Sequence, residues 1–245
     1  MDPYLSVIIP AYNEEKRITK MLNAVSSYLQ KQPYTYEVIV VVDGAKDATA
    51  DIARDFTVQI PNLKVIDRKK NMGKGYSVKE GMLAAKGKIR LFTDADNSTD
   101  ISYFEKMKPL FDKGIDVVIS SRDQKDASGA GQEVPQSFLK RMMGNMGNLY
   151  IQIMAVPGIW DTQNGFKAFR DYAAEKIFHA VKINRWAFDV EALALAKKFD
   201  YKIGIIPIRW INDPSSHVGM MSYLKVLFDV LIIRLNLMRR KYDEQ

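Results

Sequence analysis

The stretch Ile89-Arg-Leu-Phe-Thr-Asp94-Ala-Asp96 decides how the rest of the chain is interpreted. A short apolar run, typical of a buried strand, ends in two carboxylates spaced one residue apart. In open α/β sheets, ligands bind at the carboxyl edge of the strands, where Asp94 and Asp96 are expected. Paired carboxylates that leave room for water and phosphate oxygens suit Mg²⁺ or Mn²⁺. Because an Asp-x-Asp pair also arises by chance, a solvated turn remains the alternative for this stretch alone.

Further buried strands are expected on both sides of this stretch. Apolar runs rich in β-branched residues predict strands at residues 5–10, 37–42, 64–67 and 116–121. Apolar residues at helical spacing lie between them, for example within residues 18–29. Strands that alternate with helices predict an α/β fold with a mostly parallel sheet and right-handed crossovers.

Polar residues come directly after several of these strands, at 12–15, at Asp43, at 94–96 and at 121–122. Because the carboxyl ends of parallel strands share one edge of the sheet, these residues are expected to meet there. A cluster of acids at that edge is electrostatically unfavourable without a cation. The spacing excludes a phosphate-binding P-loop, and no Gly-x-Gly-x-x-Gly follows the first strand, so a dinucleotide site is disfavoured.

Composition narrows the class of protein. The chain has 245 residues, of which 47% are hydrophobic, enough for one sizeable α/β core. It has no cysteine, which excludes disulfides and thiolate metal sites, and its two histidines disfavour a multi-histidine zinc site. The net charge of +7 favours anionic partners such as nucleotides or phospholipids, but no nucleic-acid-binding motif is found. Neither a signal peptide nor a transmembrane helix is expected.

Several motifs occur in the order that is typical of family 2 glycosyltransferases of the GT-A fold. Ser6-Val-Ile-Ile-Pro-Ala-Tyr-Asn-Glu14 resembles the opening strand and nucleotide loop of that family. Val42-Asp-Gly-Ala-Lys-Asp-Ala-Thr49 resembles its Asp-Asp-Gly-Ser-x-Asp-x-Thr segment, with Val42 and Ala45 as departures. Asn71-x-Gly-Lys-Gly75 and the Asp-x-Asp pair complete the set. The GT-A fold is therefore expected over most of the chain.

Three later segments narrow the resemblance within the family. Residues 121–122, 161–167 and 185–191 are similar to polyprenyl-phosphate sugar transferases, most of all to dolichyl-phosphate glucosyltransferases. This implies inverting transfer of a hexose from a nucleotide sugar, with UDP-glucose as the favoured donor, to a polyprenyl phosphate. A mannosyltransferase that uses GDP-mannose is the close alternative. A nucleotidyltransferase and a non-catalytic nucleotide-sugar sensor are the more distant ones.

The resemblance also assigns residues to the nucleotide sugar and to a metal. The implied nucleotide-sugar contacts are Pro10, Tyr12, Glu14, Asp43, Lys74, Asp94 and Arg122. Asp94 and Asp96 are expected to hold Mg²⁺ or Mn²⁺, which would bridge the diphosphate and offset the charge of the leaving group. Arg122 is expected to fork onto a phosphate.

On the acceptor side the assignments stay open. By the resemblance, Asp161 is the candidate base, and an apolar neighbourhood is expected to raise its pKa. Asp189 competes for this role, although it also suits the cap of a helix over residues 190–198. Arg141 and Lys167 are the candidate contacts to the acceptor phosphate on the catalytic domain.

The last element expected is an amphipathic helix over residues 219–241, which divides the chain into a catalytic domain, 1–218, and an interfacial helix with its tail, 219–245. The helix either docks on its own domain or lies in a membrane interface. Five basic residues against one acid in this segment favour the membrane. The protein is accordingly expected to be peripheral, on the cytoplasmic face of a membrane.

Within this helix, Arg234 is expected to project from the middle of the apolar face. An unpaired guanidinium in an apolar contact is costly, so Arg234 needs a partner or access to water. It either pairs with an acid of the catalytic domain, reaches lipid headgroups, or meets the phosphate of the acceptor. The third placement is the working hypothesis.

Overall fold

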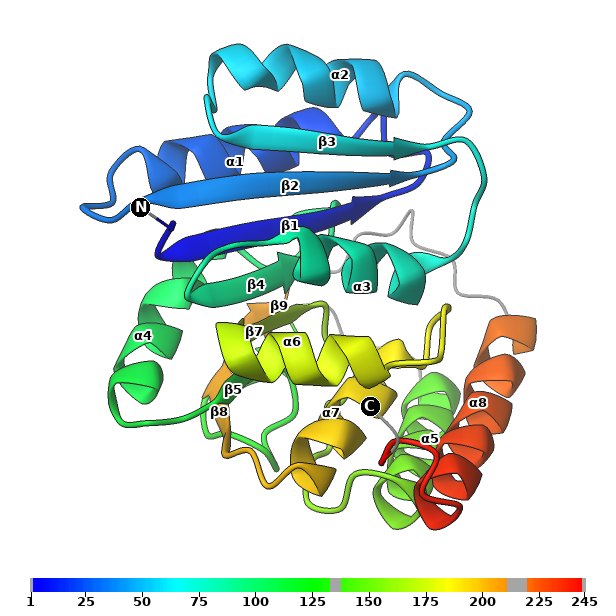
Figure 1. The fold of residues 1–245 in the computed structure, drawn as a ribbon. Helices are drawn as coiled ribbons and strands as arrows, with labels where there is room; N and C mark the ends of the chain where they lie inside the picture. The colour runs from blue at the N-terminus through cyan, green and yellow to red at the C-terminus, as the bar shows by residue number, and fades with distance from the viewer. Residues whose placement is uncertain (1, 133–137, 211–219, 244–245) are drawn as a thin grey trace.

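In a computed structural model, the protein is described over residues 2–132, 138–210 and 220–243. A seven-stranded sheet with the order β3-β2-β1-β4-β7-β5-β8 lies between layers of helices (Figure 1). Its strands are β1 (Leu5–Ala11), β2 (Tyr36–Asp43), β3 (Leu63–Arg68), β4 (Ile89–Thr93), β5 (Val117–Ser121), β7 (Phe166–Arg170) and β8 (Ile203–Pro207). A separate two-stranded pair is formed by β6 (Gly131–Gln132) and β9 (Arg209–Trp210).

The helices follow the strands along the chain. They are α1 (Ile18–Leu29), α2 (Thr49–Asp55), α3 (Lys74–Ala84), α4 (Phe104–Asp112), α5 (Phe138–Met154), α6 (Asp171–Ala180), α7 (Phe188–Lys198) and α8 (Met220–Met238). Two short 3₁₀ helices are η1 (Phe56–Val58) and η2 (Ile101–Tyr103).

The sheet is buried on both faces, as the continuous apolar runs of its strands predict. Val7 and Ile9 belong to a hydrophobic cluster that includes α1, whereas Ile8 belongs to a second cluster that includes α3, α6 and α7. Successive side chains of a strand point to opposite faces, so the two clusters lie on opposite sides of the sheet. The two-sided core confirms the predicted α/β architecture.

The sheet is mostly parallel, but β7 runs antiparallel between β4 and β5. This strand was not expected from the sequence, because Lys167 and Arg170 interrupt its apolar pattern. Lys167 is nevertheless fully buried. The sequence pattern therefore missed a central strand, because one of its buried residues is charged.

The topology brings the polar segments together as predicted. β1 is paired in parallel with both β2 and β4, so Ala11, Asp43 and Thr93 end at the same edge of the sheet. β5 and β4 are both antiparallel to β7, so Arg122, which follows β5, leaves the sheet at that edge as well. This edge holds the candidate site.

The expected C-terminal helix is present as α8, which packs against α5 and α7 (Figure 1). Val226, Val230 and Ile233 form its buried face. Asn236 is buried on this inward side as well, because it lies beside Ile233 and bonds to Tyr242. The proposed domain boundary between residues 218 and 219 lies outside the described residues.

Along the described ranges, no helix combines the length and the apolar character that crossing a membrane requires.

Candidate active site

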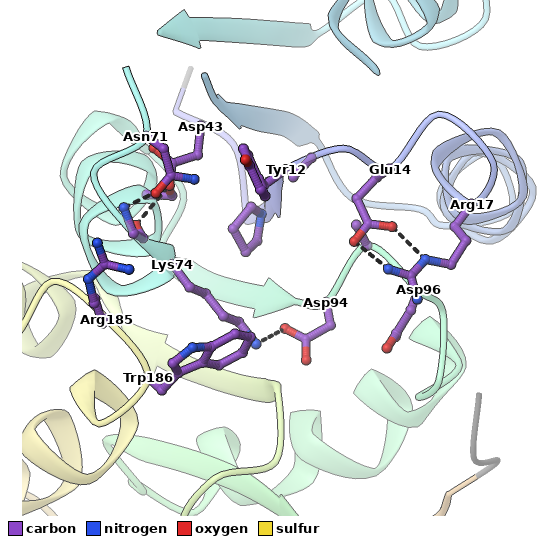
Figure 2. A pocket seen from close by; sticks show the side chains of 15 residues that line it. Tyr12, Glu14, Arg17, Asp43, Asn71, Lys74, Asp94, Asp96, Arg185 and Trp186 are labelled. Atoms are coloured by element: carbon purple, nitrogen blue, oxygen red, sulfur yellow. Dashed lines mark hydrogen bonds and ion pairs between the residues drawn. The ribbon is translucent and has the colours of Figure 1, made fainter. Parts of the chain in front are cut away.

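A cavity of about 460 Å³ lies at the carboxyl edge of β1, β2 and β4 (Figure 2). It is lined by Pro10, Ala11, Tyr12, Glu14, Arg17, Asp43, Asn71, Gly73, Lys74, Ser77, Asp94, Ala95, Asp96, Arg185 and Trp186. The cavity thus gathers both predicted metal ligands and every predicted nucleotide-sugar contact except Arg122.

Two exposed aromatic side chains flank the centre of this cavity. Tyr12 comes from the segment after β1 and is 45% exposed, and Trp186 comes from the segment before α7 and is 44% exposed. Figure 2 shows them on opposite sides of the pair formed by Lys74 and Asp94. Exposed aromatic faces in a polar cavity are suited to stacking against a planar base or the apolar face of a sugar ring.

Asp43 shapes one wall of the cavity from within. Its carboxylate accepts hydrogen bonds from the backbone N–H groups of Met72 and Gly73, both at 2.8 Å, and from Arg68 at 2.6 Å. Gly73 has a φ of +103°, which L side chains rarely adopt. Asp43 therefore fixes the turn that presents Asn71 and leads into α3.

Lys74 and Asp94 form an ion pair of 2.6 Å at the centre of the cavity. Burial acts to lower the pKa of Lys74, but Asp94 and Asp189 outweigh it and the pKa is raised. The Lys74 ammonium also lies 5.5 Å from the centroid of the Trp186 ring. Lys74 is therefore a firmly charged cation, held where the phosphates of a ligand would meet a carboxylate.

Gly165 explains how Asp94 fits at the end of β4. A Cβ at residue 165 would lie 2.1 Å from Oδ2 of Asp94, and the Asp94 N–H donates to the Gly165 carbonyl at 3.1 Å. Any side chain at this position would displace the carboxylate. The glycine of the 161–167 motif is thus a structural requirement of the Asp-x-Asp pair.

Asp96 lies at the same end of the cavity as Glu14, which pairs with Arg17 at 2.6 Å (Figure 2). Burial raises the pKa of the Glu14 carboxyl despite Arg17, and Asp96 and Asp94 raise it further. The accumulated negative charge here suits a cation.

The residues present fit a divalent metal bound mainly through its substrate. The described residues contain no group of three or more side chains of metal-ligand type. Asp94 and Asp96 would therefore supply two carboxylates, with phosphate oxygens and water as the remaining ligands. Mg²⁺ commonly binds in this way.

The pairing of Asp161 with Arg122 corrects two predictions about Asp161. Arg122 donates from Nε and Nη2 to both oxygens of Asp161, each at 2.8 Å, and its backbone N–H donates to the same carboxylate. Burial acts to raise the pKa of Asp161, but Arg122 outweighs it and holds that pKa below its usual range. The neighbourhood of Asp161 is thus cationic where an apolar one was expected, and its pKa is lowered where a raised one was expected. The expected contact of Arg122 with a phosphate stays a prediction.

Lys167 corrects a third prediction. Its ammonium is fully buried and pairs with Asp189 at 2.7 Å, so it offers no surface to an acceptor phosphate. Asp189 lies in the first turn of α7, and its carboxylate points to Lys167, so it is no helix cap. Burial raises the pKa of Asp189, even though Lys167 and Lys74 act to lower it.

The other two candidate phosphate contacts lie on the helix pair α5 and α8. Arg141 belongs to α5, and its side chain lies outside the part that the structure describes. Arg234 is on the exposed face of α8, between the half-exposed Leu231 and Leu235. Among the residues that the structure describes, Arg234 forms no ion pair.

The cavity residues that were not assigned to the site from sequence include Arg17, Ser77, Arg185 and Trp186. Arg17 directly precedes α1 and Ser77 lies in the first turn of α3, where only the fold turns them toward the cavity. Arg185 and Trp186 open a motif that had been quoted for its similarity to the family, so their position next to Asp189 was the available signal.

Comparisons with known proteins agree with this geometry. Residues 6–178 match the family described as glycosyl transferase family 2. The chain is 35% identical over 243 residues to the dolichyl-phosphate beta-glucosyltransferase of Dictyostelium discoideum, covering 94% of this chain and 74% of that protein. It is 34% identical over 249 residues to the protein of that name from Homo sapiens, covering 94% and 75%.

Solved structures support the fold. Glucosyl-3-phosphoglycerate synthase from Mycobacterium tuberculosis, in complex with Mn²⁺, UDP and glucosyl-3-phosphoglycerate, has a TM-score of 0.64 at 18% identity, covering 96% of this chain and 79% of that chain. S. aureus TarS 1–349 in complex with UDP-GlcNAc has a TM-score of 0.60 at 22% identity, covering 96% and 67%. With the expected GT-A architecture in place and the family match extending over most of the sequence, the chain belongs to glycosyl transferase family 2.

Proposed function

We propose that the protein transfers glucose from UDP-glucose to dolichyl phosphate or a related polyprenyl phosphate, with inversion at the anomeric carbon. The observation that carries the proposal is one cavity that combines an exposed tyrosine, a cation and two carboxylates: Tyr12, Lys74, Asp94 and Asp96. These are the groups that a nucleotide, a diphosphate and a divalent metal require. The relatives named dolichyl-phosphate beta-glucosyltransferase support glucose as the sugar.

Asp94 and Asp96 would hold Mg²⁺ or Mn²⁺. When bound, such an ion offsets the negative charge that develops on a leaving nucleoside diphosphate. Two structural neighbours, crystallised with UDP and Mn²⁺ or Mg²⁺, support a divalent metal.

The residues of the chain would bind and orient the donor. Tyr12 would stack against the base, with Pro10, Glu14 and Asp43 completing that end of the cavity. Lys74 would exchange Asp94 for the donor phosphates, because both side chains of this pair line the cavity and are partly exposed to it. The sugar would then lie toward Trp186, which is exposed on the far side of this pair.

Asp189 is the better candidate for the group that handles the acceptor proton. A phosphate monoester is already largely ionised near neutral pH, so a base need only orient it or take a residual proton. A base needs a pKa near the working pH. The pKa of Asp189 is raised, the direction that a base requires, whereas both oxygens of Asp161 are bound to Arg122 and its pKa is lowered.

A lipid acceptor requires contact with a membrane, and the helix pair offers a surface for it. We call this surface the apolar ridge; its large exposed side chains are Met146, Leu149 and Ile153 of α5 and Leu224, Phe228, Leu231, Leu235 and Met238 of α8. Arg234 lies within the ridge and Lys225 beside it. Exposed apolar stripes with basic residues are typical of helices in a membrane interface.

One assay tests the proposal. The protein is incubated with radiolabelled UDP-glucose, GDP-mannose or UDP-N-acetylglucosamine, Mg²⁺ or Mn²⁺, and dolichyl phosphate in liposomes, and label is counted in the lipid phase. Transfer from UDP-glucose with release of UDP is the expected result. Transfer from GDP-mannose alone would replace the donor, release of pyrophosphate would indicate a nucleotidyltransferase, and binding without transfer would indicate a sensor.

A further inference from the structure

Glu191 is a fully buried carboxylate that the proposed reaction does not use. Its Oε2 accepts hydrogen bonds from the backbone N–H groups of Lys182, at 2.9 Å, and Ile183, at 2.7 Å. Its Oε1 accepts from the hydroxyl of Tyr242 at 2.6 Å. Burying a carboxylate is costly unless such bonds are made. Glu191 therefore links two segments firmly: the backbone at residues 182–183 and the tail at Tyr242.

The first of these segments forms a wall of the donor cavity. Arg185 and Trp186, which follow the bound Ile183 by two and three residues, line the cavity. The same segment is packed on the start of α3: a Cβ at Gly73 would lie 2.4 Å from the carbonyl oxygen of Asn184, and one at Gly75 would lie 2.6 Å from that of Ile183. Backbones this close move together, because there is no space between them to absorb a shift.

This packing extends to the central cation. The Tyr76 N–H donates to the Asn184 carbonyl at 3.0 Å, and Lys74 is the first residue of the same helix. A displacement of residues 182–186 therefore changes the position of both Trp186 and Lys74.

The second segment follows the lipid-facing helix. Tyr242 comes shortly after α8 and is buried, and Asn236 of α8 lies 3.5 Å from its hydroxyl. The next residue, Asp243, forms an ion pair with Lys198 at the end of α7. The tail of α8 is thus attached to the catalytic domain at several points. A shift of the helix would therefore also displace the groups that bond to Glu191.

We propose that Glu191 and Tyr242 are positioning residues that couple the seating of α8 on a lipid surface to the binding of the nucleoside diphosphate. Seating of the apolar ridge holds Tyr242 and Glu191 in place, which fixes residues 182–186 and closes the cavity around the diphosphate. Such coupling is reciprocal, so a bound nucleotide also strengthens the association with lipid. The inference rests on the proposed function for its nucleotide and its membrane.

Calorimetric titration of UDP with Mg²⁺ tests the coupling without any acceptor or turnover. The full chain is titrated alone and with vesicles of phosphatidylcholine and phosphatidylserine. We expect the vesicles to tighten UDP binding about fivefold in the wild-type protein, the lower end of usual coupling factors. Tyr242→Phe should still bind UDP and vesicles, because only the hydroxyl that links Tyr242 to Glu191 is lost. In this variant the vesicles should leave the affinity for UDP almost unchanged, a ratio of about 1.

Two variants serve as controls. Tyr172→Phe removes a different tyrosine hydroxyl, which bonds to Asp116 away from the cavity, and should keep the full effect of vesicles. Glu191→Gln keeps one oxygen that can accept from the backbone and a second group that can bond to Tyr242, so it should retain most of the coupling.

Hydrogen exchange gives a readout that requires no variant to fold. The amides of Lys182 and Ile183 should exchange more slowly when vesicles are added to the wild-type protein. Equal UDP affinity with and without vesicles, in a protein that binds both, would overturn the inference, as would undiminished tightening in Tyr242→Phe. A wild-type protein that binds no UDP at all would overturn the proposed function as well, and this outcome is distinct from the first.

Discussion

Two lysine–aspartate pairs of nearly equal length show how differently the two sides of the site are built. Lys74 and Asp94 lie 2.6 Å apart with side chains 20% and 32% exposed, whereas Lys167 and Asp189 lie 2.7 Å apart and are 0% and 4% exposed. The first pair opens into the cavity, and a ligand can separate it. The second is sealed inside the sheet and α7, where losing one partner leaves a buried charge. The donor side is therefore made of exchangeable charges and the acceptor side of fixed ones.

The largest effect is expected at the exchangeable side. Asp96→Ala should lower kcat/KM for transfer about 10³-fold, which corresponds to roughly 4 kcal/mol of lost transition-state stabilisation. The fold should persist, because Asp96 is only partly buried and lines the cavity. Initial rates measure kcat/KM, and the melting temperature measures the stability of the fold. Asp112→Ala, an exposed acid at the end of α4, is the control. Full activity in Asp96→Ala, or in wild type with chelator, would remove the metal from the account.

The fixed side should separate chemistry from stability. Asp161→Asn should cost about 3 kcal/mol of unfolding free energy, because it leaves Arg122 without its charge partner. Asp189→Asn should be destabilising as well, because it leaves the fully buried Lys167 without its charge partner, and it should in addition lower the kcat of the folded enzyme about 10²-fold with little change in donor binding. Urea unfolding and steady-state kinetics on both variants distinguish the two. A kcat loss confined to Asp161→Asn would restore the assignment that the sequence favoured.

Low pH should weaken the ion pair of Asp161 and Arg122. The pKa of Asp161 is lower in the folded protein than in the unfolded chain, so its contribution to stability is present above about pH 4 and disappears as pH falls through the folded pKa. Melting temperatures between about pH 2 and 6 should fall less steeply in Asp161→Asn than in wild type. Asp189 has the opposite sign, since its raised pKa favours folding at low pH and loses that effect as pH rises through the folded value. Parallel acid profiles for wild type and Asp161→Asn would contradict the assigned pairing.

The smallest effect is expected at the apolar ridge. Arg234→Gln should raise the KM for the polyprenyl phosphate about fivefold, which corresponds to about 1 kcal/mol for one basic group at a lipid surface. UDP binding and the melting temperature should stay near wild type, because Arg234 is exposed. Lys225→Gln, beside the ridge, is the comparison. A large loss of stability would indicate an internal partner, and weaker vesicle binding at an unchanged KM would indicate lipid headgroups.

The donor side could be predicted from sequence because its residues are local. Tyr12, Asp43 and the Asp-x-Asp pair each come directly after an apolar strand, and parallel strands deliver such residues to one edge whatever the details of packing. The α/β class followed from the alternation of strands and helices, and the C-terminal helix from its amphipathic pattern. No long-range contact had to be known.

The acceptor side could not be predicted, because the charge and the pKa of its residues depend on partners that are distant in the sequence. Asp161 bonds to Arg122, 39 residues away, and Lys167 to Asp189, 22 residues away. A lysine inside a central strand contradicts the usual pattern of burial, and only the tertiary partner makes it tolerable. The apolar residues of α8 cover both a buried face and an exposed one, so the sequence alone left open whether this helix docks on its domain or lies in a membrane interface.

A structure of the protein with UDP and Mn²⁺ tests the central claim most directly. The claim is that the cavity between Tyr12 and Trp186 is the donor site and that Lys74 exchanges Asp94 for phosphate. We expect an anomalous Mn²⁺ signal between Asp96, Asp94 and the diphosphate. The Lys74 ammonium should have moved from the carboxylate to a phosphate oxygen. UDP bound outside this cavity, or bound within it while the pair of Lys74 and Asp94 stays intact, would contradict it.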